Sequence, residues 1–485
     1  MSIGWLDGKI AAGVESSNIM SDALRKIPAV ERLLEEVQAE DWTAEVPRRI
    51  LVEALRAATD RARMRLREDP SHEADSNTLR RTILTEARHN VESAILPHYR
   101  KVINATGIIL HTALGRAVLP AKAIRQITEE LSGYSLVQVD VETGRRSRRD
   151  GRIEWLLQQL TGAEAATVVN NNAAATSIVL NTVAKGKEVI VSRGQLVEIG
   201  GSFRLPDVMA ASGATLVEVG TTNKTHARDY ENAITPNTAA LLRVHPSNYK
   251  ITGFTAEVPL EALVRIAHQR GLPLIDDVGA GPLVDFSPLG FEKEPTLQAS
   301  VRAGADLITC SADKLIGGSQ GGLILGRADL VQAIRKNPFA RIVRVGKLTL
   351  AALESTLSLF LDETQAFSGV PTLRMLRRSL ADLTAQAERI AQAILEKSPA
   401  ATAVTIDGYS QMGSGSLPTQ NLATRLVAIQ SEAPPPEEIA LRLRRASPPI
   451  FARVHKGRVL LDPRTLLAGE EAILVEGVTA ALRCE

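Results

Sequence analysis

The sequence predicts an α/β protein with a mainly parallel sheet, preceded by a helical N-terminal domain and followed by a small α+β domain. Short runs of Val, Ile and Leu alternate with helical segments from about residue 101 onward. Most of these runs are apolar throughout, which is typical of strands that helices cover on both faces. The flanking stretches show helical spacing on one side and mixed helix and hairpin signals on the other. We therefore expect three domains, over residues 1–95, 96–355 and 356–485.

The first domain is expected to consist of helices alone. The stretches IPAVERLLEEVQAE (27–40) and PRRILVEALRAATDRARMRLRED (47–69) place apolar residues at helical spacing. A third helix is expected from residue 76 to residue 95, with Ser76 or Asn77 as its N-cap.

The second domain is expected to hold the sheet. Seven strand candidates follow one another along the chain: ATVVN (166–170), EVIVS (188–192), TLVEVG (215–220), ALLRVH (240–245), PLIDDVG (273–279), ADLITC (305–310) and GLILG (322–326). Helical segments such as LEALVRIAHQRG (260–271) lie between them, and LTLAALESTLSLFLDE (348–363) is expected to be a helix that leads into the third domain. Ligands of open α/β sheets bind beyond the carboxyl ends of the strands, so the residues after each strand are the first candidates for a site.

The overall charge is close to balanced, with 57 Lys and Arg against 55 Asp and Glu. No global field therefore draws the chain to nucleic acid or to a membrane, so any RNA contact must use local patches, and DNA is not an expected partner. Cys310 and Cys484 are the only cysteines, too few for a disulfide framework or a structural zinc site. Residues 1–20 lack the pattern of a signal peptide, and no apolar run reaches the roughly 20 residues that span a bilayer. These features predict a cytoplasmic protein.

Two groups of side chains after the strands suggest a ligand site. The stretch NNAAATS (171–177) opens a helix, so Asn171, Asn172 and Ala173 either hold a phosphate with their free N–H groups or form an ordinary cap. The neighbours Asp276 and Asp277 point to opposite faces of a strand end. On their own they would fit a metal ligand, a cap or a solvated turn.

A lysine follows a third strand in the stretch SADK, which places Ser311 and Lys314 at the strand end. A lone lysine there is usually solvent-exposed, but the order phosphate cradle, Asp277 and then Lys314 is typical of pyridoxal phosphate enzymes. In such a site the lysine forms an imine with the cofactor aldehyde, and the carboxylate keeps the pyridine nitrogen protonated. The serine and the helix N-terminus hold the phosphate. A dinucleotide-binding fold fits less well, because its glycine pattern should follow the first strand and GGSQGG (317–322) leads into a late one.

Arginines suggest a second anion-binding element. Arg116 lies in a turn before the sheet, and Arg341 and Arg344 are three residues apart. This spacing predicts one shared helical face, suited either to a phosphate-like anion or to a salt-bridged surface. A basic loop, TGRRSRRDGR (143–152), could contact RNA phosphates or be solvated; its arginines are Arg145, Arg146, Arg148, Arg149 and Arg152.

Longer stretches resemble the bacterial selenocysteine synthases, the L-seryl-tRNA(Sec) selenium transferases. They include VINATGIILHTALGRAVLP, VVNNNAAAT, VSRGQLVEIGGSFRLPDVM, VHPSNYKITGFT and DLITCSADKLIGGSQGGLILG, and together they span most of residues 28–470. The resemblance implies a fold-type I pyridoxal phosphate-dependent transferase that forms a homo-oligomer, described in the family as a decamer built from dimers. It assigns the cofactor lysine to Lys314, the carboxylate at the pyridine nitrogen to Asp277, and anion binding to Arg116, Arg341 and Arg344. It leaves the individual roles of the arginines in the basic loop open.

The reaction implied by the resemblance converts seryl-tRNA(Sec) to selenocysteinyl-tRNA(Sec) with selenophosphate, through loss of the serine hydroxyl and an aminoacrylyl-tRNA intermediate. Lys314 is then a candidate base, and its pKa is expected to be lowered by the arginines and the cofactor. The N-terminal domain is implied to bind tRNA, and residues 48–67 carry seven arginines against Glu53 and Asp60.

Two other functions stay open. A related ammonia lyase acting on a small phosphorylated amino sugar would not require the helical N-terminal domain. A non-catalytic RNA-binding protein would have no chemical need for Lys314, Asp277 and Ser311 together.

Overall fold

The structure is a computed structural model that describes residues 24–68, 75–201, 203–417 and 420–483. The expectations for residues 1–20 and for Cys484 lie outside the described residues. The chain divides into two compact units between Lys101 and Val102. The finer division at residue 355 remains a prediction. Within the described ranges, no helix is long and apolar enough to cross a membrane.

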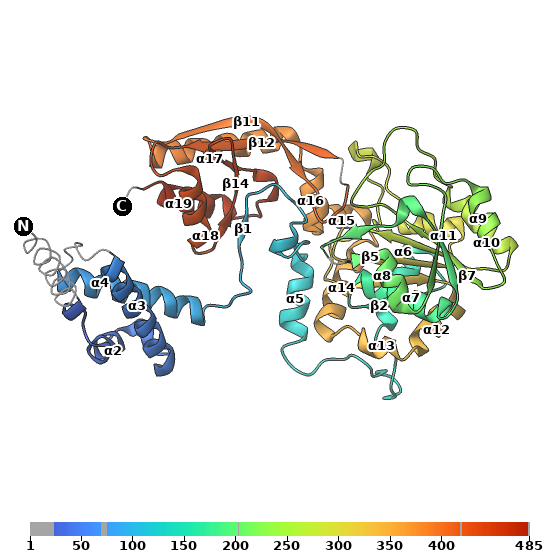
Figure 1. Ribbon diagram of the computed structural model, residues 1–485, viewed down its shortest axis with the longest axis horizontal. Helices are drawn as coiled ribbons and strands as arrows, with labels where there is room; N and C mark the ends of the chain where they lie inside the picture. The colour runs from blue at the N-terminus through green and yellow to red at the C-terminus, as the bar shows by residue number, and fades with distance from the viewer. Residues whose placement is uncertain (1–23, 69–74, 202, 418–419, 484–485) are drawn as a thin grey trace, which may run out of the picture. The chain divides into compact units, whose positions relative to one another are not determined.

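Within residues 24–68 and 75–101, the first unit contains three α-helices, α2 (Val30–Gln38), α3 (Arg48–Glu68) and α4 (Ser76–Ile95), shown in blue in Figure 1. Their apolar faces meet in one core, in which Leu33 and Ile83 are fully buried. The helical spacing of the sequence therefore correctly predicted these helices.

The N-cap of α4 is Asp75, so the prediction of Ser76 or Asn77 is wrong. The Asp75 carboxylate accepts hydrogen bonds from the backbone N–H groups of Asn77 (2.7 Å) and Thr78 (2.8 Å). The hydrogen bonds that Asp75 accepts from the backbone and the side chain of Thr78 are the main reason why its pKa is lowered. A carboxylate in this position satisfies two free amides at the positive end of the helix, whereas Ser76 is already the first helical residue.

The second unit is built on a seven-stranded sheet with the order β2-β10-β9-β8-β7-β3-β6. The strands are β2 (Ala165–Val169), β3 (Glu188–Ser192), β6 (Thr215–Val219), β7 (Thr238–Val244), β8 (Leu274–Gly279), β9 (Leu307–Ser311) and β10 (Gly322–Gly326). All seven predicted strands are confirmed, each within two residues of its expected bounds. Only β10 runs antiparallel to its neighbours, so the sheet is mainly parallel, as predicted.

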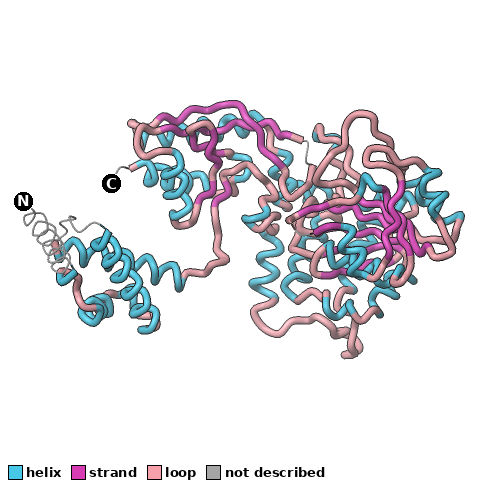
Figure 2. The backbone as a smooth tube through the Cα atoms, in the orientation of Figure 1, coloured by secondary structure: helices cyan, strands magenta, loops and turns pink. Residues whose placement is uncertain are grey.

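Helices cover both faces of this sheet, which explains why its strands are apolar throughout (Figure 2). One face packs against α7 (Asn172–Ala184), α8 (Leu205–Ser212) and α12 (Ala328–Lys336). The other packs against α6 (Gly151–Thr161), α10 (Leu260–Gln269), α11 (Leu297–Ala303) and α14 (Lys347–Leu359). Further helices complete this region: α5 (Ala121–Glu130), α9 (Ala227–Ala233), α13 (Phe339–Ile342), α15 (Glu363–Gly369) and α16 (Pro371–Arg377). A small hairpin, β4 (Glu198–Ile199) and β5 (Phe203–Arg204), lies beside the sheet.

The C-terminal part of the unit has its own sheet, of order β11-β12-β15-β14. Its strands are β11 (Thr402–Gln411), β12 (Asn421–Gln430), β14 (Arg453–His455) and β15 (Arg458–Leu461). The helices α17 (Leu380–Lys397), α18 (Pro436–Arg445) and α19 (Glu470–Leu482) share a core with it. A short parallel pair joins β1 (Ile103–Asn104), at the start of the unit, to β13 (Ile450–Phe451). The chain therefore enters the second unit along its C-terminal part before it reaches the large sheet.

The cap of α4 gives a test of this local structure. Asp75→Ala should destabilise the start of α4 by about 1 kcal/mol, because two amides lose their acceptor. Hydrogen exchange of the full-length protein should then be about fivefold faster at Asn77 and Thr78. Asn77→Ala keeps the cap and serves as the control. Equal protection in the two variants would contradict the assignment of Asp75.

Candidate active site

A cavity of about 590 Å³ lies at the carboxyl edge of the large sheet. Three predicted groups line it: Ser311 at the end of β9 with Lys314 after it, Asn171, Asn172 and Ala173 at the start of α7, and Arg116. They meet because β2 and β9 both pair with β10 in antiparallel fashion and so end at the same edge. The remaining described residues of the lining come from loops and from the β4–β5 hairpin: Thr112, Ile199, Gly200, Phe203, Asn248, Asp313, Gln320, Ser414 and Gly415.

Lys314 is buried, with 8% of its surface exposed. Burial is the main cause that lowers its pKa, and Arg116 lowers it further, while the charges of Asp277 and Asp313 raise it. The expectation of a lowered pKa thus holds in direction, but burial outweighs the arginines as its cause. More of the amine is consequently neutral at a given pH, and the neutral amine is the nucleophilic and basic form.

The two neighbouring aspartates of β8 face opposite sides of the sheet. Asp277 accepts hydrogen bonds from Asn172 Nδ2 (2.9 Å) and Thr176 Oγ1 (2.9 Å) of α7. Asp276 instead pairs with Arg243 Nη1 (2.8 Å) and accepts from Ser300 Oγ (2.6 Å) on the other face. Only Asp277 therefore lies beside the predicted phosphate cradle.

Asp277 is electrostatically coupled to Lys314. Burial raises the pKa of Asp277, while its hydrogen bonds and the nearby charge of Lys314 lower it. Its third hydrogen bond comes from the backbone N–H of Gly279 (3.1 Å). The carboxylate is thus held in one orientation beneath the cavity.

The start of α7 is shaped to receive an anion. Asn171 Oδ1 accepts a hydrogen bond from the Ala174 N–H (2.9 Å), which fixes the first turn. The first N–H groups of any α-helix lack acceptors within the helix, and those of Asn172 and Ala173 lie at the cavity. Gly322 of β10 is required here, because a Cβ at this position would overlap the Asn171 carbonyl oxygen.

Arg116 lines the same cavity as Lys314 and is held there by an ion pair with Asp313. Its Nη1 donates to Asp313 Oδ2 at 2.7 Å. Its backbone lies in the left-handed region, at φ 61°, which costs a residue other than glycine about 1 kcal/mol. The fold therefore holds this arginine against its local preference.

The prediction that Arg341 and Arg344 share a helical face is wrong. Helix α13 ends at Ile342, and Arg344 instead forms a bridge with Val169 at the end of β2. The chain leaves the helix because the carbonyl of Val343 accepts a hydrogen bond from the Asn170 N–H (3.0 Å).

Both arginines are exposed, and the described lining of the Lys314 cavity includes neither of them. They belong to a separate basic cluster with Arg146 and Arg149. The charge of Arg149 is the first cause that lowers the pKa of Arg344, followed by desolvation, Arg341 and Arg146. Like charges at this density favour an anionic ligand.

Several arginines of the basic loop have partners within the chain. Arg149 donates to the Val345 carbonyl (3.0 Å) and to Gln138 Oε1 (3.2 Å). Arg148 pairs with Glu154, and Arg152 pairs with Glu354. Part of the positive charge of the loop is therefore already compensated.

Sequence reasoning missed the loop residues that close the cavity, notably Thr112, Asn248 and Ser414. Thr112 and Asn248 lie in stretches that carried the family resemblance, but neither follows a strand directly. Ser414 comes from the C-terminal part of the unit, more than 90 residues after Lys314. The glycines around it in MGSGS were the only local signal.

Comparisons with known proteins agree with this geometry. Residues 102–467 match the family described as L-seryl-tRNA selenium transferase, and residues 24–63 match the family described as selenocysteine synthase N terminal. The L-seryl-tRNA(Sec) selenium transferase of Desulfomicrobium baculatum is 44% identical over 464 residues, which is 96% of this chain and 100% of that protein. The enzyme of the same name from Solidesulfovibrio magneticus is 46% identical over 464 residues, with 95% and 98% covered.

A solved structure shares the fold. D-glucosaminate-6-phosphate ammonia-lyase superposes with a TM-score of 0.55 at 22% identity, over 81% of this chain and 98% of its own. This likeness concerns the fold alone and agrees with the predicted fold class. The family match over residues 102–467 and the near full-length relatives decide the assignment: the chain belongs to the L-seryl-tRNA selenium transferase family.

Proposed function

We propose that this protein replaces the hydroxyl group of L-seryl-tRNA(Sec) with a selenol, giving L-selenocysteinyl-tRNA(Sec). Selenophosphate supplies the selenium and leaves as phosphate, and pyridoxal 5′-phosphate is the cofactor. The observation that carries the proposal is the buried Lys314 in a cavity shared with the start of α7, Ser311 and Arg116. Relatives that are 44% and 46% identical over almost the whole chain carry the name of this activity.

The residues around Lys314 fit this cofactor. Ser311 and the first N–H groups of α7 would hold its phosphate, since the positive end of a helix favours an anion. Asp277 would hold a proton at the pyridine nitrogen, because a carboxylate can accept about four hydrogen bonds and Asn172, Thr176 and Gly279 donate three. When bound, the cofactor supplies an aldehyde that reacts with amines and a ring that takes up electrons.

One polar atom of the cavity wall supports the presence of a bound ligand. Asn172 Oδ1 is buried and has no hydrogen-bond partner among the described residues. Leaving such an atom unpaired costs about 1–3 kcal/mol, so a ligand that donates a hydrogen bond there would be favoured.

The protein's own residues would handle the proton and the anion. Lys314 would hold the cofactor between turnovers and exchange a proton with the serine Cα, for which its lowered pKa suits it. Arg116, oriented by Asp313, would bind the phosphate-like end of the selenium donor with its planar guanidinium.

The N-terminal helices are the proposed tRNA-binding domain. A tRNA substrate also supports a cytoplasmic location for the proposed reaction. The match of residues 24–63 to the N-terminal family supports this role. The charge of α3 supports it less than its arginine count suggests, because Arg61 and Arg65 both pair with Glu86 and Arg63 pairs with Asp60. Contacts other than charge would therefore have to contribute to recognition.

The proposed assembly is a homo-oligomer, a decamer built from dimers as in the family resemblance. Exposed apolar side chains beside the basic cluster support association with a second copy, since large exposed apolar groups mark interfaces. They are Tyr134, Leu136, Val141, Ile342 and Leu348. Because the described lining of this chain's Lys314 cavity lacks Arg341 and Arg344, we propose that they bind the selenium donor at the cavity of another copy.

The two rival functions have weaker support. The ammonia lyase shares the fold with this chain, but a sequence identity of 22% gives no information about the substrate. Burial beside Arg116 is unfavourable for the charged amine of Lys314. The function of a non-catalytic RNA-binding protein would not require such a buried lysine.

Lys314→Ala should abolish covalent attachment of the cofactor. The wild type incubated with pyridoxal 5′-phosphate should be yellow, and borohydride should fix the cofactor to the peptide that contains Lys314, as detected by mass spectrometry. Lys336→Ala, at an exposed lysine of α12, should behave like the wild type. A colourless wild type would contradict the mechanism.

Arg344→Ala should raise the selenophosphate concentration needed for half-maximal turnover more than it changes cofactor attachment. If Arg344 acts on another copy, co-refolded Arg344→Ala and Lys314→Ala chains should regain about a quarter of wild-type activity, because mixed dimers contain one intact site. If the activity of the co-refolded mixture only equals the sum of the activities of the two variants refolded separately, Arg344 does not act across copies.

Removal of residues 1–95 should weaken binding of seryl-tRNA(Sec) at least tenfold and leave cofactor binding intact, because the two compact units separate near this point. Filter binding with bulk seryl-tRNA as the control measures both affinity and selectivity. Unchanged affinity for seryl-tRNA(Sec) would reject the tRNA-binding role.

A further inference from the structure

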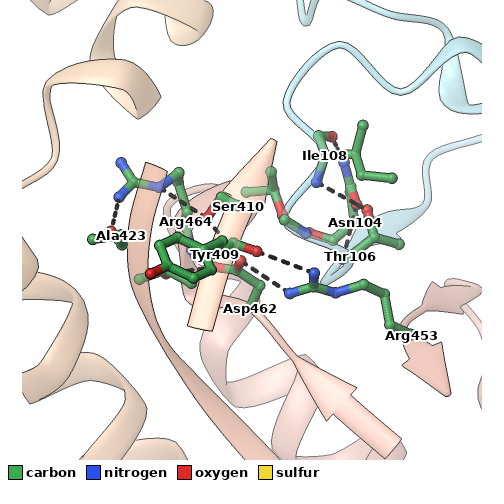
Figure 3. Close-up of polar contacts among 12 residues, drawn as sticks. Asn104, Thr106, Ile108, Tyr409, Ser410, Ala423, Arg453, Asp462 and Arg464 are labelled. Atoms are coloured by element: carbon green, nitrogen blue, oxygen red, sulfur yellow. Dashed lines mark hydrogen bonds and ion pairs between the residues drawn. The ribbon is translucent and has the colours of Figure 1, made fainter. Parts of the chain in front are cut away.

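A fully buried carboxylate, Asp462, lies in the C-terminal part of the second unit, directly after β15. Its Oδ2 accepts hydrogen bonds from Ser410 Oγ (2.8 Å) and Arg453 Nη2 (3.4 Å), as Figure 3 shows. Its Oδ1 accepts from Thr424 Oγ1 (2.9 Å) and from the backbone N–H of Arg464 (3.0 Å). Burying a carboxylate is costly, and the four hydrogen bonds that offset this cost fix its orientation.

Arg464 extends this network across the C-terminal sheet. Its guanidinium donates to Ser410 Oγ (3.0 Å), to the Ala423 carbonyl (2.6 Å) and to the Met375 carbonyl (2.9 Å). Burial lowers the pKa of Arg464, and the charge of Asp462 opposes this. Met375 belongs to α16, so the network joins strands β11 and β12 to the segment that leads from the large sheet to the small one.

Asp462 also contacts the base of the segment formed by residues 105–116, here called the first arm. Its backbone N–H donates to the Ala105 carbonyl (2.9 Å). Gly107 has φ 74°, and a Cβ there would overlap the Asp462 carboxylate. Thr465 adds two bonds, accepting from the Gly107 N–H (3.1 Å) and donating to the Asn104 carbonyl (2.7 Å).

A second arm, residues 410–417, runs beside the first. The Gln411 N–H donates to the Gly107 carbonyl (2.9 Å), the Ile109 N–H to the Gln411 carbonyl (3.0 Å), and the Leu110 N–H to the Met412 carbonyl (2.7 Å). The two arms thus form a short parallel ladder whose base is the Asp462 network, since Ser410 begins the second arm.

The tips of both arms line the Lys314 cavity. Thr112 and Arg116 come from the first arm, and Ser414 comes from the second. The tips are bonded to each other, because Ser414 Oγ donates to the Leu110 carbonyl (2.8 Å) and lies 3.0 Å from Thr112 Oγ1.

We propose that Asp462 is a positioning residue that fixes the base of both arms and thereby sets where Thr112, Arg116 and Ser414 stand opposite Lys314. The catalytic consequence rests on the proposed function. Asp277 lies in the large sheet and Lys314 directly follows one of its strands, and neither is among the described hydrogen-bond partners of Asp462. Attachment of the cofactor and placement of the substrate should therefore respond separately. A role in stability alone would not separate them.

Substitutions that delete side-chain hydrogen bonds to Asp462 test the proposal. Asp462→Asn would leave Arg464 without its buried carboxylate, so Thr424→Val and Ser410→Ala are the working variants. Thr479→Val is the matched control, because Thr479 is also a buried threonine of this part of the chain and bonds only to the Val475 carbonyl (2.8 Å) in α19. All variants are made in the full-length protein.

Hydrogen exchange gives the first readout and needs no assumption about the reaction. Exchange at Ile109 and Leu110, whose amides bond to the second arm, should be about fivefold faster in Thr424→Val and Ser410→Ala, and unchanged in Thr479→Val. Wild-type protection of these amides in both working variants would overturn the proposal.

Kinetics give the second readout. The working variants should need about three to ten times more seryl-tRNA(Sec) for half-maximal turnover, with unchanged borohydride fixation of the cofactor on Lys314. A shift no larger than that of Thr479→Val would overturn the catalytic consequence. If the wild type transfers no selenium, the proposed function fails, and the exchange measurement still decides whether Asp462 holds the arms.

Discussion

The site depends on the electrostatic balance between a buried lysine and a buried aspartate at one edge of a parallel sheet. Lys314 and Asp277 are both removed from water, which favours the neutral form of each, while each charge stabilises the other. The proposed reactivity of the lysine depends on this balance, which also supports the carboxylate. Everything else in the site is arranged around it: Asn172 and Thr176 hold the aspartate, and Asp313 holds Arg116 near the amine.

The sheet and the side chains at its strand ends could be predicted because their signals are local. A covered parallel strand must be apolar along its length, so the strands were visible in the sequence, and the residues after them were the natural candidates. Because side chains alternate along a strand, the sequence also predicted that Asp276 and Asp277 point to opposite faces of the sheet. Only the packing partners, Arg243 on one face and Asn172 on the other, show which aspartate lies on the side of α7.

The errors arose where a local rule competes with a contact that the sequence does not show. Three-residue spacing suggested one helical face for Arg341 and Arg344, but the helix ends when Val343 pairs with Asn170 at the sheet edge. Ser76 fits the rule for a cap, yet Asp75 reaches the same amides with a full charge. Ser414 could not be predicted, because its place at the cavity depends on two arms that are about 300 residues apart in the chain.

The antiparallel strand β10 has a consequence for movement. It returns directly from the end of β9 and pairs with it along its whole length, so the segment that carries Lys314 is tied to the sheet at both of its ends. A parallel crossover would have followed the lysine with a helix free to shift as a body. The wall of the cavity that carries Lys314 is therefore tied to the sheet, so any opening or closing of the site would have to come from the other lining segments, among them those that carry Arg116 and Ser414.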